Sequence, residues 1–207
     1  MNTVKLRIIS ALIMALLMTG FKAMAQKDER AREILEAMTA AYNEKDGLEI
    51  KFGGTVGGKI LLKGNMFMLD CDGMKTWFDG VTQWSFIEES NEVNISSPTQ
   101  EELGMANPYA MIRMYENGYN YKFMGTEKIK GESCSKILMI PEAEQNYQSI
   151  TVWINETMVP VHIEFVYTEE DKETISVEKY KTRTDLTEDN FRFDMDAHPD
   201  AEIIDLR

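Results

Sequence analysis

The chain has 207 residues, 35 of them acidic and 22 basic, and a formal net charge of −13. This charge argues against nucleic acid as a partner, because binding it requires lysines and arginines that neutralise phosphates. The length suits one domain with a sizeable core, and no Pro/Ser-rich linker or internal repeat divides the chain.

The first 25 residues have the order of a secretory signal. Two basic residues precede an apolar run from Ile8 to Met18, and small residues end the segment at Ala25. Lys22 interrupts the apolar run before it reaches the roughly 18 residues of a membrane span. No cysteine lies at the cleavage point, so we expect no lipid anchor. We expect cleavage after Ala25 and a single exported domain of residues 26–207, soluble in the periplasm.

The exported part opens with an amphipathic helix from Glu29 to Lys45. Its apolar residues recur at helical spacing between charged ones, and Gly47 is a stop signal. Strands are predicted from Leu48 to Phe52 and from Lys59 to Lys63, separated by two glycine pairs that break the pattern.

The segment from Gly64 to Ile95 is predicted to form an antiparallel meander. Its turns are marked by Asp72-Gly73 and Asp79-Gly80, and Asp-Gly between apolar runs is a strong hairpin signal. Its strands carry large aromatic side chains that need one buried face. The four predicted strands are Met66 to Cys71, Lys75 to Phe78, Gln83 to Ile87 and Glu92 to Ile95, and the aromatic residues are Phe67, Trp77, Trp84 and Phe86.

Two short helices are predicted after the meander. The first begins at Pro98, and the second runs from Tyr109 to Glu116 after the cap Asn107-Pro108 and ends at Asn117-Gly118. The second helix is apolar on almost every side, so it must be enclosed or must cover an apolar surface. Its apolar residues include Met111, Ile112, Met114 and Tyr115.

Strands return in the C-terminal half. Partial alternation of apolar and polar residues from Thr174 to Tyr180 indicates a sheet with one solvent-exposed face. About ten to twelve short strands are too many for a small flat sheet, which favours a curled or nearly closed barrel. The remaining predicted strands are Tyr119 to Met124, Ser133 to Ile140, Ser149 to Ile154, Pro160 to Tyr167 and Thr174 to Thr182, with a weak pair at Phe191 to Asp194 and Ala201 to Asp205.

No motif in the sequence points to catalysis, a cofactor or a metal. The segment Gly53 to Lys59 fits a phosphate-loop spacing, but Ile60 replaces the required Ser or Thr and a strand follows. The two histidines, His162 and His198, have no metal-ligand spacing. Asp70 and Asp72 beside a turn are explained by turn chemistry.

Two side-chain types leave alternatives open. Cys71 and Cys134 would be oxidisable in an exported protein, but their separation in sequence does not establish a disulfide. The 15 methionines are well above ordinary usage. They fit either an apolar site that repacks around variable ligands or a methionine-filled core.

The order of these segments resembles the periplasmic lipoprotein carriers of the LolA family. The similarity covers nearly all of residues 26–207, and the turn Asp72-Gly73-Met74-Lys75-Thr76-Trp77 is its best single motif. The other segments that carry it are the N-terminal helix, the strand pair from Gly58 to Phe67, the apolar helix from Asn107 to Tyr115, and the C-terminal pieces Asp189 to Phe193 and Ile203 to Asp205.

The resemblance implies an incomplete antiparallel β-barrel with an N-terminal helix and a short helical lid around an apolar cavity. In this family the cavity carries lipoprotein acyl chains between the inner and outer membranes. The implied partners are acylated lipoproteins, an inner-membrane lipoprotein-release complex and an outer-membrane receptor. The expected oligomeric state is a monomer. This chain reads Lys63-Gly64-Asn65 where the best-known members have an arginine that ties the lid shut.

We therefore expect a carrier without catalytic activity; the alternative is a periplasmic sensor or regulatory module on the same open barrel. Phe67 and Trp77 match aromatic residues of the family's sheet, and Tyr109 to Tyr115 matches its lid. The residues expected to share the apolar interior are Phe67, Trp77, Trp84, Phe86, Met111, Ile112, Met114 and Tyr115.

Overall fold

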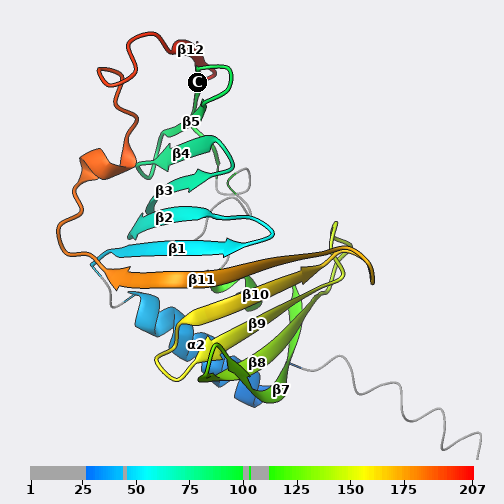
Figure 1. The fold of residues 1–207 in the computed structure, drawn as a ribbon. Helices are drawn as coiled ribbons and strands as arrows, with labels where there is room; N and C mark the ends of the chain where they lie inside the picture. Colours follow the sequence, from blue (N-terminus) through cyan, green and yellow to red (C-terminus); the bar gives the residue numbers. More distant parts are fainter. Residues whose placement is uncertain (1–26, 44–45, 100–102, 104–111) are drawn as a thin grey trace, which may run out of the picture.

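The computed structural model describes residues 27–43, 46–99, 103 and 112–207. These residues form one large β-sheet that curls around helix α2 (Glu29–Asn43), as Figure 1 shows. The expected signal segment, most of the first short helix and Met111 of the expected lid lie outside the described residues.

The sheet contains twelve strands in the described part of the chain, and its two end strands do not pair with each other. Neighbours pair antiparallel, except that β12 runs parallel to β6. The predicted open antiparallel barrel with an N-terminal helix is thereby confirmed. In spatial order the strands are β12 (Glu202–Asp205), β6 (Glu92–Ser96), β5 (Gln83–Ile87), β4 (Met74–Phe78), β3 (Met66–Cys71), β2 (Gly58–Lys63), β1 (Leu48–Gly54), β11 (Lys172–Thr182), β10 (Pro160–Val166), β9 (Ser149–Asn155), β8 (Glu132–Pro141) and β7 (Tyr119–Ile129).

The turn chemistry sets the register of the meander. Asp72 and Gly73 both have positive φ, 49° and 76°, which is the backbone of a two-residue type I′ hairpin. This turn places Cys71 opposite Met74 and fixes every later pair of β3 and β4. The predicted meander, which corresponds to β3 to β6, is confirmed by consecutive antiparallel pairing.

Asp28 links the start of α2 to an edge of the sheet. One carboxylate oxygen accepts a hydrogen bond from the backbone N–H of Ala31 at 3.1 Å, which caps the helix. The other oxygen accepts from the N–H of Phe123 at 3.3 Å, and the N–H of Asp28 donates to the carbonyl of Tyr121. The helix therefore sits against β7 and buries Ala31, Leu35 and Met38 against the inner face of the curled half.

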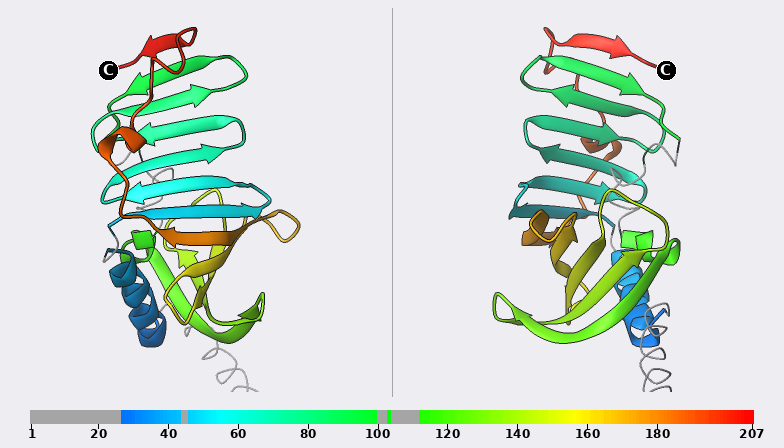
Figure 2. Two further views of the ribbon diagram at one scale, coloured as in Figure 1. Left: turned by 60° about the vertical axis from the view of Figure 1, so that its left-hand side comes forward. Right: turned by 90° about the vertical axis from the view of Figure 1, so that its right-hand side faces the viewer.

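The C-terminal segment from residue 183 onward crosses the outer face of β2 to β6 (Figure 2). Leu186 and Phe191 pack on the outer face of β2 and β3, and Phe193 packs farther along on β5 and β6. The predicted strand from Phe191 to Asp194 is wrong. Its start belongs to the 3-10 helix η3 (Glu188–Phe191), where the N–H of Thr187 donates to the side-chain oxygen of Asn190.

Candidate functional site

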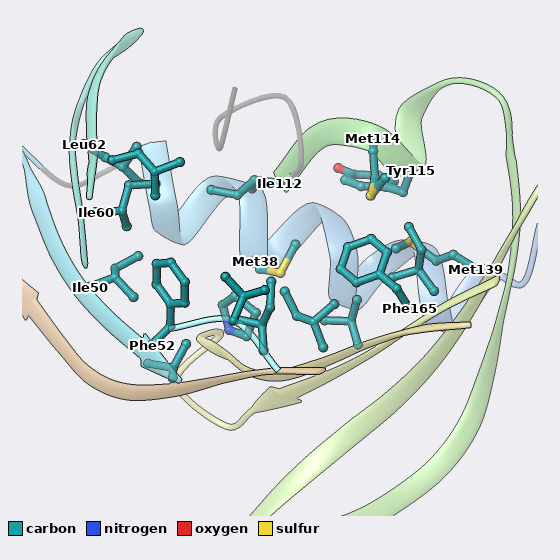
Figure 3. A pocket seen from close by; sticks show the side chains of 18 of the residues that line it. Met38, Ile50, Phe52, Ile60, Leu62, Ile112, Met114, Tyr115, Met139 and Phe165 are labelled. Carbon is teal, nitrogen blue, oxygen red and sulfur yellow. The ribbon is translucent and has the colours of Figure 1, made fainter. Parts of the chain in front are cut away.

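A cavity of about 310 Å³ lies inside the curve of the sheet. One wall comes from the inner faces of β1 and β2, where Ile50, Phe52, Ile60 and Leu62 alternate with residues that point outward (Figure 3). This alternation follows from the two-residue period of a strand, which sends every second side chain to the same face. The alternating sequence of β1 and β2 therefore determines which of their side chains form this wall.

The opposite wall comes from β8 to β11. Ile150 and Val152 of β9 and Ile163 and Phe165 of β10 line the cavity, and Met139 of β8 extends this wall. Figure 3 shows Phe165 and Met139. Strand β9 is buried on both faces, which explains its nearly continuous apolar sequence. The cavity is thus enclosed by strands that lie far apart along the chain.

Helix α2 and residues 112–115 cover the cavity. Leu35 and Met38 reach it from α2, and Ile112, Met114 and Tyr115 reach it from the adjacent segment. Figure 3 shows Met38, Ile112, Met114 and Tyr115. Both covering pieces are short, so their positions depend on these apolar contacts more than on the helices themselves.

The Thr39 hydroxyl joins the two covering pieces through polar contacts. It lies 3.0 Å from the Leu35 carbonyl oxygen within α2, 3.4 Å from the Ile112 carbonyl oxygen and 3.3 Å from the Tyr115 hydroxyl. Thr39 has only 7% of its surface exposed, so this hydroxyl pair is shielded from water. The tyrosine therefore keeps a polar partner while its ring faces the cavity.

Among the described residues, the cavity lining contains no charged side chain. In this described part of the lining, the polar side-chain groups are the Tyr115 hydroxyl and the thiol of Cys71. Burial raises the pKa of this thiol, and the nearby carboxylates of Asp72 and Asp70 raise it further. A neutral thiol in an apolar wall is a poor nucleophile, so the site is built for an apolar ligand.

The β1–β2 hairpin forms part of the cavity wall. Val56 lines the cavity from the loop between β1 and β2. Gly54 has φ of 140°, and a Cβ there would lie 2.1 Å from the carbonyl oxygen of Thr174. At Gly58 a Cβ would lie 2.3 Å from the carbonyl oxygen of Asp70. These glycines let the hairpin lie close to its neighbours.

The structure brings three of the eight predicted site residues to the cavity: Ile112, Met114 and Tyr115. Phe67 lies on the same face of the sheet but beyond the end of the cavity. Its ring centroid is 5.5 Å from that of Phe78, and only 1% of its surface is exposed. Phe67 is therefore a core residue next to the site.

Trp77, Trp84 and Phe86 differ from the expectation, because they lie on the outer face of the sheet. Trp77 pairs with Trp84 across β4 and β5, and Phe86 is two residues farther on the same face. The ring of Phe193 lies 5.4 Å from Trp77 and 5.6 Å from Phe86. The C-terminal segment, whose path was not apparent from the sequence, provides their apolar partner.

The sequence analysis missed the cavity residues of the C-terminal half. Ile150, Val152, Ile163 and Phe165 were recognised only as parts of strands. Their alternation with other residues identifies a buried face, but it does not distinguish a filled core from a hollow one. The two cysteines, whose pairing was left open, are both free: Cys134 is buried and Cys71 is half-buried.

Within the described ranges, no group of three or more His, Cys, Asp or Glu residues could hold a metal ion. The described part of the chain also contains no helix that is long and apolar enough to cross a membrane.

The geometry defines a class of protein: an open barrel whose concave side holds a covered apolar cavity. A family model described as outer membrane lipoprotein carrier protein LolA matches residues 21–158, and the chain belongs to this family. The resemblance found in the sequence is confirmed. A comparison with curated protein sequences found no match.

Solved structures share the fold. An uncharacterized conserved protein from Thermus thermophilus superposes with a TM-score of 0.63 at 16% identity, over 86% of this chain and 99% of that chain. The Mycobacterium tuberculosis lipoprotein LppX gives a TM-score of 0.51 at 13% identity, over 78% of this chain and its own full length (100%). At these identities, the two comparisons show the fold alone.

Proposed function

We propose that this protein is a periplasmic carrier that binds lipoprotein acyl chains in the cavity and transfers them from the inner to the outer membrane. The observation that carries the proposal is a covered cavity of about 310 Å³ whose described lining residues carry no charge. Membership of the lipoprotein carrier family supports the same ligand class. The expected signal segment, residues 1–25, supports export.

The physical reason for a carrier lies in the cost of exposing acyl chains to water. Each exposed methylene costs about 0.8 kcal/mol, so a lipoprotein crosses an aqueous space only when its chains are covered. Ile112, Met114 and Tyr115 cover the cavity of this protein. A ligand would replace these contacts with similar apolar contacts, so the net free energy of loading would be small and binding reversible.

The proposed partners follow from this route. An inner-membrane lipoprotein-release complex would load the cavity, and an outer-membrane receptor would empty it. The chain has Gly64 where well-known family members have the arginine that ties the lid. The covering segment would be held by its apolar contacts and by the hydrogen bond between the Thr39 and Tyr115 hydroxyls, which are both uncharged.

The two free cysteines provide a direct test. Cys71 lines the cavity, whereas Cys134 is 0% exposed and reports whether the fold stays closed. The purified exported protein is alkylated with N-ethylmaleimide at alkaline pH, with and without a palmitoylated lipopeptide, and each thiol is followed by mass spectrometry. A Cys71→Ser variant identifies the signal of the cavity thiol.

The proposal expects the lipopeptide to slow alkylation of Cys71 while Cys134 stays unmodified in both samples. An unacylated peptide of the same sequence should give no protection. If Cys71 reacts at the same rate with and without saturating lipopeptide, the cavity does not bind acyl chains. That result would favour a regulatory interaction module on this fold.

A further inference from the structure

The pairing register divides the inner face of the sheet into rows that run across the strands. One row lies at the end of the strands where the β1–β2 hairpin turns. Its pairs follow directly from the register: Phe52 opposite Val177, Gly58 opposite Phe52, Cys71 opposite Gly58, Met74 opposite Cys71, and Ile87 opposite Met74. Directly opposed side chains on one face touch. Gly58 has no side chain, but the Phe52 ring covers it, since a Cβ at Gly58 would lie 2.9 Å from Phe52 Cζ, so the row is one apolar surface.

This row starts inside the cavity and ends outside it. Val177, Phe52 and Cys71 line the cavity, whereas Met74 and Ile87 do not. Met74 is 42% exposed and lies directly opposite the lining residue Cys71, and Ile87 is 36% exposed and lies one strand farther, opposite Met74. The apolar surface therefore leaves the cavity at Cys71 and continues along β4 and β5.

The neighbouring row behaves differently. Ile60 and Leu69 line the cavity, but the following inner-face residues on β4, β5 and β6 are Thr76, Ser85 and Asn94. The apolar surface of that row thus ends where the cavity ends. The row through Met74 and Ile87 stays apolar for two strands more, until Glu92 on β6 stops it.

The small size of the cavity indicates what the apolar surface at Met74 and Ile87 could bind. About 310 Å³ is at the lower end of the range for ligand pockets, and a long acyl chain exceeds such a space. The remaining carbons of the chain would need apolar contact outside the cavity. The row that passes through Cys71 offers that contact without a break.

We propose that Met74 and Ile87 form an apolar rim that holds the part of a long acyl chain that the cavity does not enclose. This inference rests on the proposed function, and it names these two residues as determinants of chain-length preference. The cavity would bind short and long chains alike through its enclosed walls. The rim would add affinity only when the chain is long enough to reach past Cys71.

The test compares two single-chain lipids, decanoyl and stearoyl lysophosphatidylcholine, kept below their micelle concentrations. Their zwitterionic headgroup avoids repulsion by the acidic surface. The rim variants are Met74→Gln and Ile87→Thr, each made in the full exported protein. Val81→Thr is the matched control, because Val81 is 71% exposed and lies in the turn at the other end of β4 and β5.

Affinity is measured by displacement of an apolar fluorophore, and thermal unfolding checks that each variant is folded. Covering about half of the exposed area of either side chain is worth roughly three- to eightfold in affinity. We expect each rim variant to weaken stearoyl binding by that factor and to leave decanoyl binding unchanged. The Val81→Thr variant should bind both lipids as the unmodified protein does.

Three outcomes would overturn the inference. If both lipids bind and the rim variants bind stearoyl lipid normally, the rim is not part of the site, and the proposed function stands. If each rim variant weakens the binding of both lipids equally, the residues support the cavity and do not determine a preference for chain length. If the unmodified protein binds neither lipid, the proposed function fails and the rim fails with it.

Discussion

Thr55 and Thr174 exchange two hydrogen bonds that fasten the β1–β2 hairpin to β11. The N–H of Thr55 donates to the carbonyl oxygen of Thr174 at 3.0 Å, and the N–H of Thr174 donates to the Thr55 hydroxyl at 3.0 Å. The next residue, Val56, lines the cavity. The threonine pair therefore fixes the position of the hairpin that carries Val56 to the cavity wall.

Replacement of Thr55 by valine should loosen the attachment of the β1–β2 hairpin to β11. The shape is kept, but the N–H of Thr174 loses its acceptor, which should lower the free energy of unfolding by about 1 kcal/mol. The exchange of a bound apolar fluorophore, followed by stopped flow, should become several-fold faster. Thr126→Val is the control, because Thr126 is an exposed strand residue of β7. Equal exchange rates in the two variants would show that the hairpin does not limit ligand passage.

Filling the cavity should block the ligand without unfolding the protein. Val177 is half-buried and lines the cavity, so Val177→Phe would place a ring in empty space. We expect fluorophore affinity to fall by at least tenfold, with a change in stability smaller than about 1.5 kcal/mol. Val81→Phe, at an exposed turn, should bind normally. Unchanged binding by the folded Val177→Phe variant would place the ligand elsewhere.

Local patterns and two-residue turns were sufficient to predict the hairpins and all the strands except Phe191 to Asp194, whereas the open barrel was implied by the resemblance to the LolA family. The sequence was not sufficient to assign strand faces. Phe67 and Trp77 lie on opposite faces of the sheet, although both are large aromatic residues on strands of the same meander. The difference depends on Phe193, which packs on the outer face from more than a hundred residues away. Such a contact leaves no periodic signal in the meander itself.

The two kinds of aromatic residue should respond differently to truncation. Phe67→Ala should cost about 3–5 kcal/mol of stability, because the ring is fully buried against Phe78. Trp84→Ala should cost less, about 2 kcal/mol, because Trp84 is half-buried under the C-terminal segment. Fluorophore binding by folded Trp84→Ala should equal that of the unmodified protein. Loss of binding in that variant would mean that the outer face contributes to the site.

Stability should fall in mildly acidic solution because of His162. Burial lowers the pKa of this ring, whose Nδ1 lies 2.7 Å from the Ser176 hydroxyl. The unfolded chain therefore binds the proton more readily, and the free energy of unfolding decreases as the pH falls through the ordinary value of about 6.5. His162→Gln should reduce this dependence in urea denaturation between about pH 7 and pH 5. An identical pH profile in the variant would assign the effect to other groups.

The segment over the cavity should respond to ligand more than the strands below it. Ile112, Met114 and Tyr115 would compete with an acyl chain for the same apolar walls, so saturating lipopeptide should change hydrogen exchange at residues 112–115. Exchange in β9, which is buried on both faces, should stay the same. Thr39→Val removes the shielded hydroxyl partner of Tyr115 and should speed exchange at residues 112–115 roughly fivefold without ligand. If these amides are as protected as β9 and do not respond to the ligand or to the substitution, the segment is ordinary core and does not open.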